Sequence, residues 1–289
     1  MVSKNNSSTN KVFNDKALNN IISSSNALLK LFCTLTVAVI ICIFIGQYAF
    51  KNGLLTCDNY VLNTYLYIIL SILLIFIVVL VNDRFGLFNS FLVWMSQGGI
   101  ARIVITFILL LCILFGLIYA LQHSIDPNNI VLSNIVWLFI ILILGIVLIP
   151  TIWFGRLNNV VGISGMLTIL ITIGVGYLGY YHGDQIVTFD WDKYLNIALI
   201  GLIIVIIIGS FTITDPKTMY IFIMTVSILS LIIFTLLLLS NHKKLKQNAD
   251  KCIDGQVVPN YPLESFGIFI KMLNIFADLI RILGMLKRK

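Results

Sequence analysis

Long apolar segments divide this chain, and they constrain its fold more than any other feature. Seven such runs are separated by short polar connections. They occupy residues 31–50, 62–81, 101–121, 133–154, 160–181, 194–213 and 218–240. A helix of about 20 apolar residues matches the hydrocarbon thickness of a bilayer. The spacing therefore predicts a polytopic membrane protein without a separate soluble domain.

These runs are expected to be helices, because only helices and closed barrels pair every backbone group inside a bilayer. Barrel strands alternate polar and apolar side chains, and these runs do not. The composition agrees, since 59% of the residues are hydrophobic and only 11% are charged, against about 25% charged in soluble domains. We expect an all-α bundle over residues 31–289, preceded by a polar, disordered cytosolic tail over residues 1–30.

Two lysine clusters bear on the orientation of the bundle. One cluster precedes the first run, and the other follows the seventh run. They consist of Lys4, Lys11, Lys16 and Lys30, and of Lys243, Lys244, Lys246 and Lys251. Basic segments favour the cytosol, yet seven crossings place the two clusters on opposite sides. Either one run does not cross or one cluster is translocated, and the sequence leaves both open. Sequons at Asn5 and Asn6 would be glycosylated only in a luminal tail.

The cysteines and other reactive side chains indicate little chemistry. Cys57 and Cys252 lie in connections and could pair if both face an oxidising lumen. The chain has no CxxC motif or His/Cys cluster that would hold a metal. It also has no Gly-rich phosphate loop and no nucleophile–base pair. We therefore expect no enzyme activity and no cofactor. The net charge of +7 is typical of basic segments beside anionic lipid, so no nucleic-acid partner is expected.

Two groups of polar residues near span ends have simple interpretations. His182, Asp184, Asp190 and Asp192 form an acidic connection that we interpret as solvated. His242 follows the seventh run and is interpreted as a surface histidine.

An eighth segment, residues 266–285, is apolar but carries charges. Its polar side chains continue a series that begins just before it, with steps of 7, 3, 4 and 3 residues. At 3.6 residues per turn this spacing places them on one narrow stripe of a helix. The stripe consists of Glu264, Lys271, Asn274, Asp278 and Arg281, and Gly267 falls on it. With this segment the bundle has seven or eight helices.

The stripe has three interpretations that the periodicity does not separate. A charge at the bilayer centre costs about 2.5–3.5 kcal/mol on insertion scales, so the stripe must avoid lipid. It could line a central pore or cavity. It could instead belong to an amphipathic surface anchor that ends in Lys287-Arg288-Lys289. Asn274, Asp278 and Arg281 could also simply pair along the helix.

The C-terminal half resembles the Bax inhibitor family, the transmembrane Bax-inhibitor-motif proteins. The closing helix of that family reads like L-Y-L-D-F-I-N-L-F followed by L-L-R-I-F-G. The matching segments here are Leu273-Asn274-Ile275-Phe276 and Leu279-Ile280-Arg281-Ile282-Leu283-Gly284. Less specific similarity lies at Ala198-Leu199-Ile200-Gly201, at Ser164-Gly165-Met166, from Gly145 to Pro150 and from Ser240 to Lys246, so that the resemblance covers about residues 133–289.

This resemblance implies a seven-helix bundle with the last helix at its centre, and therefore favours the pore-lining interpretation of the stripe. It also implies a role in suppressing cell death and in passive calcium leak from an internal store. One apolar run is then in excess, and we assign the excess to 62–81 or 101–121.

The chain departs from the family at two positions that matter for the leak. Family members carry a carboxylate in a D-T-Q-like motif at the end of the penultimate span, where this chain has Asn241, His242 and Lys243. The second family carboxylate, in the closing helix, falls on Lys271. In the family the two acids are thought to form a pH-sensitive latch around the pore. Asn241 and Lys271 cannot share a proton in that way.

We therefore expect a Bax-inhibitor-like multi-pass protein of an internal membrane, such as the endoplasmic reticulum or Golgi. It would modulate cell death or ion homeostasis with a reduced or altered calcium leak. The expected partners are the lipid bilayer and calcium or another small ion. The alternatives are an unrelated small channel or transporter and a membrane scaffold without transport. The candidate pore or latch residues are Asn241, Glu264, Lys271, Asn274, Asp278 and Arg281.

Overall fold

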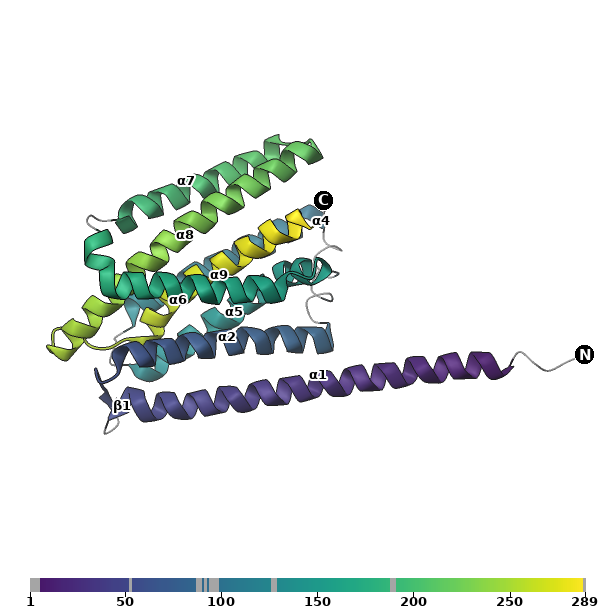
Figure 1. The fold of residues 1–289 in the computed structure, drawn as a ribbon, viewed down its shortest axis with the longest axis horizontal. Coiled ribbons are helices and arrows are strands. Elements are labelled where there is room, and N and C mark those ends of the chain that lie inside the picture. Colours follow the sequence, from purple (N-terminus) through teal and green to yellow (C-terminus); the bar gives the residue numbers. More distant parts are fainter. Residues whose placement is uncertain are drawn as a thin grey trace, which may run out of the picture.

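The computed structural model confirms an all-α bundle (Figure 1). It describes residues 6–51, 54–86, 90, 93, 99–125, 129–187 and 191–287. Eight α-helices lie within these residues. They are α1 (Asn6–Ala49), α2 (Tyr60–Phe85), α4 (Gly99–Tyr119), α5 (Ile130–Leu157), α6 (Val161–Ile186), α7 (Trp191–Thr212), α8 (Pro216–Ile253) and α9 (Tyr261–Leu286). Each coincides with one of the eight apolar segments, and α1 also includes most of the segment expected as a disordered tail.

Length and apolarity make six of the described helices capable of crossing a membrane, namely α1, α2, α5, α6, α7 and α8. The protein is therefore an integral multi-pass membrane protein. Two short elements complete the description. The strands β1 (Phe50–Lys51) and β2 (Leu54–Leu55) form an antiparallel hairpin after α1. A π-helical turn, η1 (Ala120–Ser124), extends α4.

Local signals fix where the last two helices begin. The Asp215 side chain accepts a hydrogen bond from the Thr218 backbone N–H, 2.8 Å away, and Pro216 occupies the first position of α8. The Asn260 side chain accepts from the Leu263 N–H at the start of α9. Side-chain caps of this kind satisfy backbone donors that have no partner inside the helix.

Helix α9 occupies the centre of the bundle, as Figure 1 shows. It packs against α2, α5, α6 and α8. Fully buried side chains occur along its length, including Ile268, Ile275 and Ile280. A surface anchor would leave one face open to lipid headgroups. The amphipathic-anchor interpretation of residues 266–285 is therefore wrong, and the central position is confirmed. Arg288 and Lys289, invoked for that anchor, lie outside the described residues.

The contacts at the two ends of α9 show that it traverses the whole bundle. At its start, Tyr261 donates a hydrogen bond to the Thr56 carbonyl, next to the hairpin. At its end, the Tyr220 hydroxyl from the start of α8 donates to the Met285 carbonyl, 3.3 Å away. Its 26 residues extend about 39 Å at about 1.5 Å per residue, more than the roughly 30 Å hydrocarbon core. The eighth segment is therefore long enough to cross the bilayer together with the helices around it.

Candidate functional site: the polar face of α9

The polar stripe of α9 meets α8 through two hydrogen bonds near the hairpin end of the bundle. The Asn241 amide of α8 donates to the Gly267 carbonyl, with 2.8 Å between nitrogen and oxygen. Two turns further along α8, the Asn248 amide donates to the Glu264 carboxylate at 2.6 Å. Gly267 permits the close approach, because a Cβ there would lie 3.3 Å from the Asn241 nitrogen. This part of the stripe thus binds a neighbouring helix.

The middle of the stripe has two different kinds of side chain. Lys271 is half-buried, and within the described part of the chain it has no hydrogen-bond or ion-pair partner. The charges that act on it are those of Asp192 and Lys244. Asn274 donates to the Ile270 carbonyl one turn back, at 2.7 Å. Asn274 is therefore satisfied within α9, while the Lys271 ammonium has no such partner among the described residues.

The far end of the stripe is an ion pair within α9. The Asp278 side chain is only 2% exposed, and its Oδ1 lies 3.0 Å from Nη1 of Arg281. Arg281 is 48% exposed. The other carboxylate oxygen of Asp278, Oδ2, is buried without a direct hydrogen bond among the described residues. Ser230 of α8 is the polar neighbour of this carboxylate. The local-pairing interpretation therefore holds for Asp278 and Arg281, and Asn274 is not part of that pair.

His242 corrects the sequence interpretation, because it is buried rather than on the surface. Its Nδ1 donates to the Leu238 carbonyl at 2.8 Å. In the neutral ring, Nε2 accepts from the Tyr65 hydroxyl of α2 at 2.7 Å. A glycine creates the space: a Cβ on Gly179 of α6 would lie 2.8 Å from the His242 Cβ. The glycines of the fifth run were the sequence signal that another helix approaches closely there.

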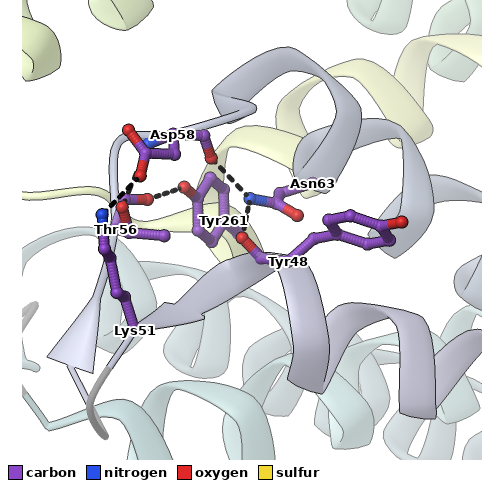
Figure 2. Close-up of polar contacts among 6 residues, drawn as sticks. All are labelled: Tyr48, Lys51, Thr56, Asp58, Asn63 and Tyr261. Carbon is purple, nitrogen blue, oxygen red and sulfur yellow. Dashed lines mark hydrogen bonds and ion pairs between the residues drawn. The ribbon is translucent and has the colours of Figure 1, made fainter.

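The hairpin end of the bundle is fastened by a disulfide and a group of polar contacts. Cys57 and Cys252 are joined across 195 residues, with their Cα atoms 5.6 Å apart, which confirms the pairing that the sequence allowed. The Asn63 amide donates to the carbonyls of Tyr48 and Asp58 at 3.1 and 3.2 Å (Figure 2). Together with the hydrogen bond from Tyr261 to Thr56, these contacts connect α1 and α2 to the end of α8 and the start of α9.

The acidic connection after α6 is not simply solvated. Asp184 lies 3.4 Å from the Lys243 ammonium, and Asp192 forms an ion pair with Lys244. Asp192 is only 15% exposed. Both lysines lie within α8, which extends to Ile253, so the second lysine cluster is helical and lies at the disulfide end. Acidic partners therefore offset part of its charge.

A cavity of about 300 Å³ lies on the other, apolar face of α9. Its walls come from α2, α5, α6 and α9. Phe269, Met272, Leu273 and Phe276 are the α9 residues that line it, and none of the stripe residues does. This cavity is therefore separate from the candidate pore or latch positions.

A comparison of the sequence with protein families gives one match. The family described as Inhibitor of apoptosis-promoting Bax1 matches residues 57–288. The chain belongs to the Bax inhibitor family. A comparison with curated proteins gave no match.

The extent of the match corrects the assignment of the additional run. The Bax inhibitor family match begins at residue 57 and therefore includes α2 through α9, but not the span in α1. The run outside the family bundle is 31–50, rather than 62–81 or 101–121. The match also begins well before residue 133, where the resemblance of the C-terminal half begins.

The structure places Asn241 and Lys271 on the facing helices of this family bundle. Asn241 is bonded one turn above Lys271 on α9. Neither of these two side chains is a carboxylate, so Asn241 and Lys271 form no carboxylate–carboxylate contact.

Proposed function

We propose that this Bax inhibitor family member modulates cell death from within an internal membrane, with the calcium leak of the family suppressed. The observation that carries this proposal is the pair of residues at the family's two carboxylate positions. Asn241 is bonded to the Gly267 carbonyl, and Lys271 adds a positive charge one turn along the same helix. These features close the calcium path in two physically independent ways.

The first way is the loss of a titratable link between α8 and α9. A pair of carboxylates at close range shares a proton, and its strength changes with pH. An amide does not titrate, so the hydrogen bond from Asn241 to Gly267 holds α8 against α9 at any physiological pH. A change in pH therefore does not weaken the hydrogen bond between Asn241 and Gly267.

The second way is electrostatic. A unit positive charge and a divalent cation repel each other by about 8 kcal/mol at about 4 Å in an effective dielectric of about 20. Lys271 has no ion-pair partner within the described residues that would cancel its charge. Calcium moving along the polar face of α9 therefore meets a barrier where the family has an attractive carboxylate.

Calcium efflux from vesicles containing the purified protein tests both the loss of the titratable link and the electrostatic barrier. We expect wild-type efflux to equal that of protein-free vesicles across the neutral pH range. The double substitution Asn241→Asp with Lys271→Asp should restore a pH-dependent leak. Lys217→Asp serves as the control for the Lys271→Asp part of the change, because it alters the charge by the same amount at an exposed position at the start of α8. Robust pH-gated efflux from the wild-type protein would contradict the proposal.

Protection of cells from a death stimulus tests the other half of the proposal. Cells expressing the wild-type chain should survive better than cells expressing none. Survival conferred without calcium efflux is the result that the proposal expects, and it would show that protection does not require the leak. No protection in cells, with folded protein present in the membrane, would exclude the role in cell death.

The disulfide supports an orientation for the proposed protein. Disulfides persist in oxidising compartments, so the end with Cys57 and Cys252 faces the lumen and the other end faces the cytosol. That cytosolic end carries Arg84, Arg156 and Lys217, which the positive-inside rule favours there, whereas the second lysine cluster lies at the luminal end beside Asp184 and Asp192. In this orientation every run would cross, and the cluster from Lys243 to Lys251 would be luminal.

A glycosylation assay tests this orientation. The sequons at Asn5 and Asn6 should remain unmodified, and a sequon inserted between β1 and β2 should be modified. The reverse pattern would refute the luminal position of the disulfide.

A further inference from the structure

The cavity beside α9 opens sideways, toward the bilayer. Three of the residues that line it also lie on the outer surface of their helices, with exposed fractions of 43% for Ile72, 46% for Phe76 and 53% for Ile169. Ile72 and Phe76 belong to α2, and Ile169 belongs to α6. In a membrane protein these surfaces contact acyl chains. The opening therefore lies between α2 and α6, at a level occupied by lipid.

The depth of the cavity matches one leaflet. On α6 its lining extends from Val161, the first residue of the helix, to Ile169. Eight helical steps at about 1.5 Å correspond to about 12 Å, close to half of the roughly 30 Å hydrocarbon core. The cavity therefore begins near the membrane surface at the Arg156 end and stops near the middle of the bilayer.

The walls favour hydrocarbon over water. Apart from Arg156 and Thr168, the lining consists of aliphatic and aromatic side chains and Gly165. The Thr168 hydroxyl already donates to the Ser164 carbonyl at 2.8 Å. Water would thus find few partners inside. An acyl chain makes the dispersion contacts that these walls would otherwise lose, and such chains surround the opening.

Positive charge marks the surface end of the cavity. Arg156 lines it, and its Nη1 lies 2.8 Å from both carboxylate oxygens of Asp83. That pair occupies one guanidinium nitrogen, and Arg156 remains 43% exposed. Lys287 lies close by, because it donates to the Asn159 carbonyl in the turn that follows Arg156. Two cations against one carboxylate leave a positive site for a headgroup.

We propose that this cavity binds one acyl chain of an anionic phospholipid, with the phosphate-bearing headgroup at Arg156 and Lys287. The positive end of the cavity lies opposite the disulfide, and so in the cytosolic leaflet of the orientation proposed above, where anionic lipids concentrate. The binding site itself does not depend on calcium transport or on cell-death activity.

Native mass spectrometry of the full chain in detergent micelles tests the site. The probes are phosphatidylserine and phosphatidylcholine with identical oleoyl chains. We expect one tightly retained phospholipid per protein and a preference of about fivefold for phosphatidylserine, the effect of about one additional cation near a surface. Equal retention of both lipids by the wild-type protein would refute the headgroup assignment.

Matched substitutions on α6 separate the cavity from lipid that merely coats the protein. Gly165→Leu places a side chain in the cavity, where a Cβ meets nothing closer than Phe276 at 4.0 Å. Gly162→Leu makes the same change on an open surface with nothing within 4 Å. The first should lose the retained lipid and the second should keep it. Equal retention by the two variants would overturn the proposal.

A second pair keeps the test decisive if Gly165→Leu fails to fold. Ile169→Trp blocks the opening from the outside, and Ile173→Trp adds the same bulk to an exposed position one turn away that does not line the cavity. For the headgroup, Arg156→Gln should abolish the phosphatidylserine preference while Arg84→Gln should keep it. An unchanged preference in Arg156→Gln would remove Arg156 from the site.

Discussion

The contact between α6 and α8 at Gly179 allows a quantitative test of the packing. A Cβ at this position would lie 2.5 Å from the Leu239 carbonyl oxygen and 2.8 Å from the His242 Cβ. A carbon atom normally approaches a carbonyl oxygen to about 3.3 Å, so the shortfall is about 0.8 Å. Because the carbonyl belongs to the α8 backbone, a side chain cannot rotate away to relieve it. In Gly179→Ala the two helices must separate.

The expected loss of stability follows from this displacement. Overpacking of this kind typically costs about 1–3 kcal/mol. Gly174→Ala is the matched control, because it lies on the same helix and its Cβ would meet nothing within 4 Å. Both substitutions gain the same helix propensity, about 1 kcal/mol, which cancels in the comparison. Gly179→Ala should therefore be less stable than Gly174→Ala by about 1–3 kcal/mol.

Reversible unfolding in mixed micelles measures this difference. The free energy of unfolding is determined for both variants under the same conditions, with intrinsic fluorescence as the probe of tertiary structure. If Gly179→Ala unfolds at the same denaturant concentration as Gly174→Ala, or at a higher one, then α6 and α8 do not approach as closely as described, and the reasoning fails.

Three other changes test separate parts of the fold. Cys252→Ser should abolish the difference in gel mobility between oxidised and reduced protein that the bond to Cys57 produces, and unchanged mobility differences would mean that another cysteine pairs. Asp215→Ala should speed hydrogen exchange in the first turn of α8. Hydrogen bonds from Thr218 lower the pKa of Asp215, so in the wild-type protein this protection is complete at neutral pH and is lost as the pH falls below the ordinary aspartate value toward the lowered one. A protection factor, relative to the intrinsic exchange rate at each pH, that stays constant across this range would contradict the cap. Tyr261→Phe should destabilise the protein by about 1 kcal/mol, measured by thermal unfolding in micelles, because the Thr56 carbonyl loses its donor.

Some features were predictable because they depend on local chemistry. A run of apolar residues inserts into a bilayer because of its own length and composition, so all eight segments are visible in the sequence. Helical periodicity likewise places Lys271, Asn274 and Asp278 on one face of α9 without knowledge of any partner. The Cys57–Cys252 pair could be named as an option, since both residues lie outside the apolar runs.

Other features depend on which helices meet, and the sequence does not encode this locally. The periodicity of α9 is the same for a surface anchor and for a central helix, and only packing against α2, α5, α6 and α8 decides between them. His242 follows an apolar run, so it resembles a surface residue until Gly179 of α6 and Tyr65 of α2 are seen to surround it. The sequence alone indicates a solvated Asp192, because Lys244, its partner, lies on another helix.

The sequence by itself determined that this protein spans the membrane many times and that its last helix has a polar face, because burial in lipid acts on each segment separately. The tertiary structure decided that this helix lies at the centre, that Asn241 holds it against α8, and that an apolar cavity lies on its opposite side. Those features arise where side chains from distant segments exclude one another or leave space, and such complementarity exists only once the helices have packed.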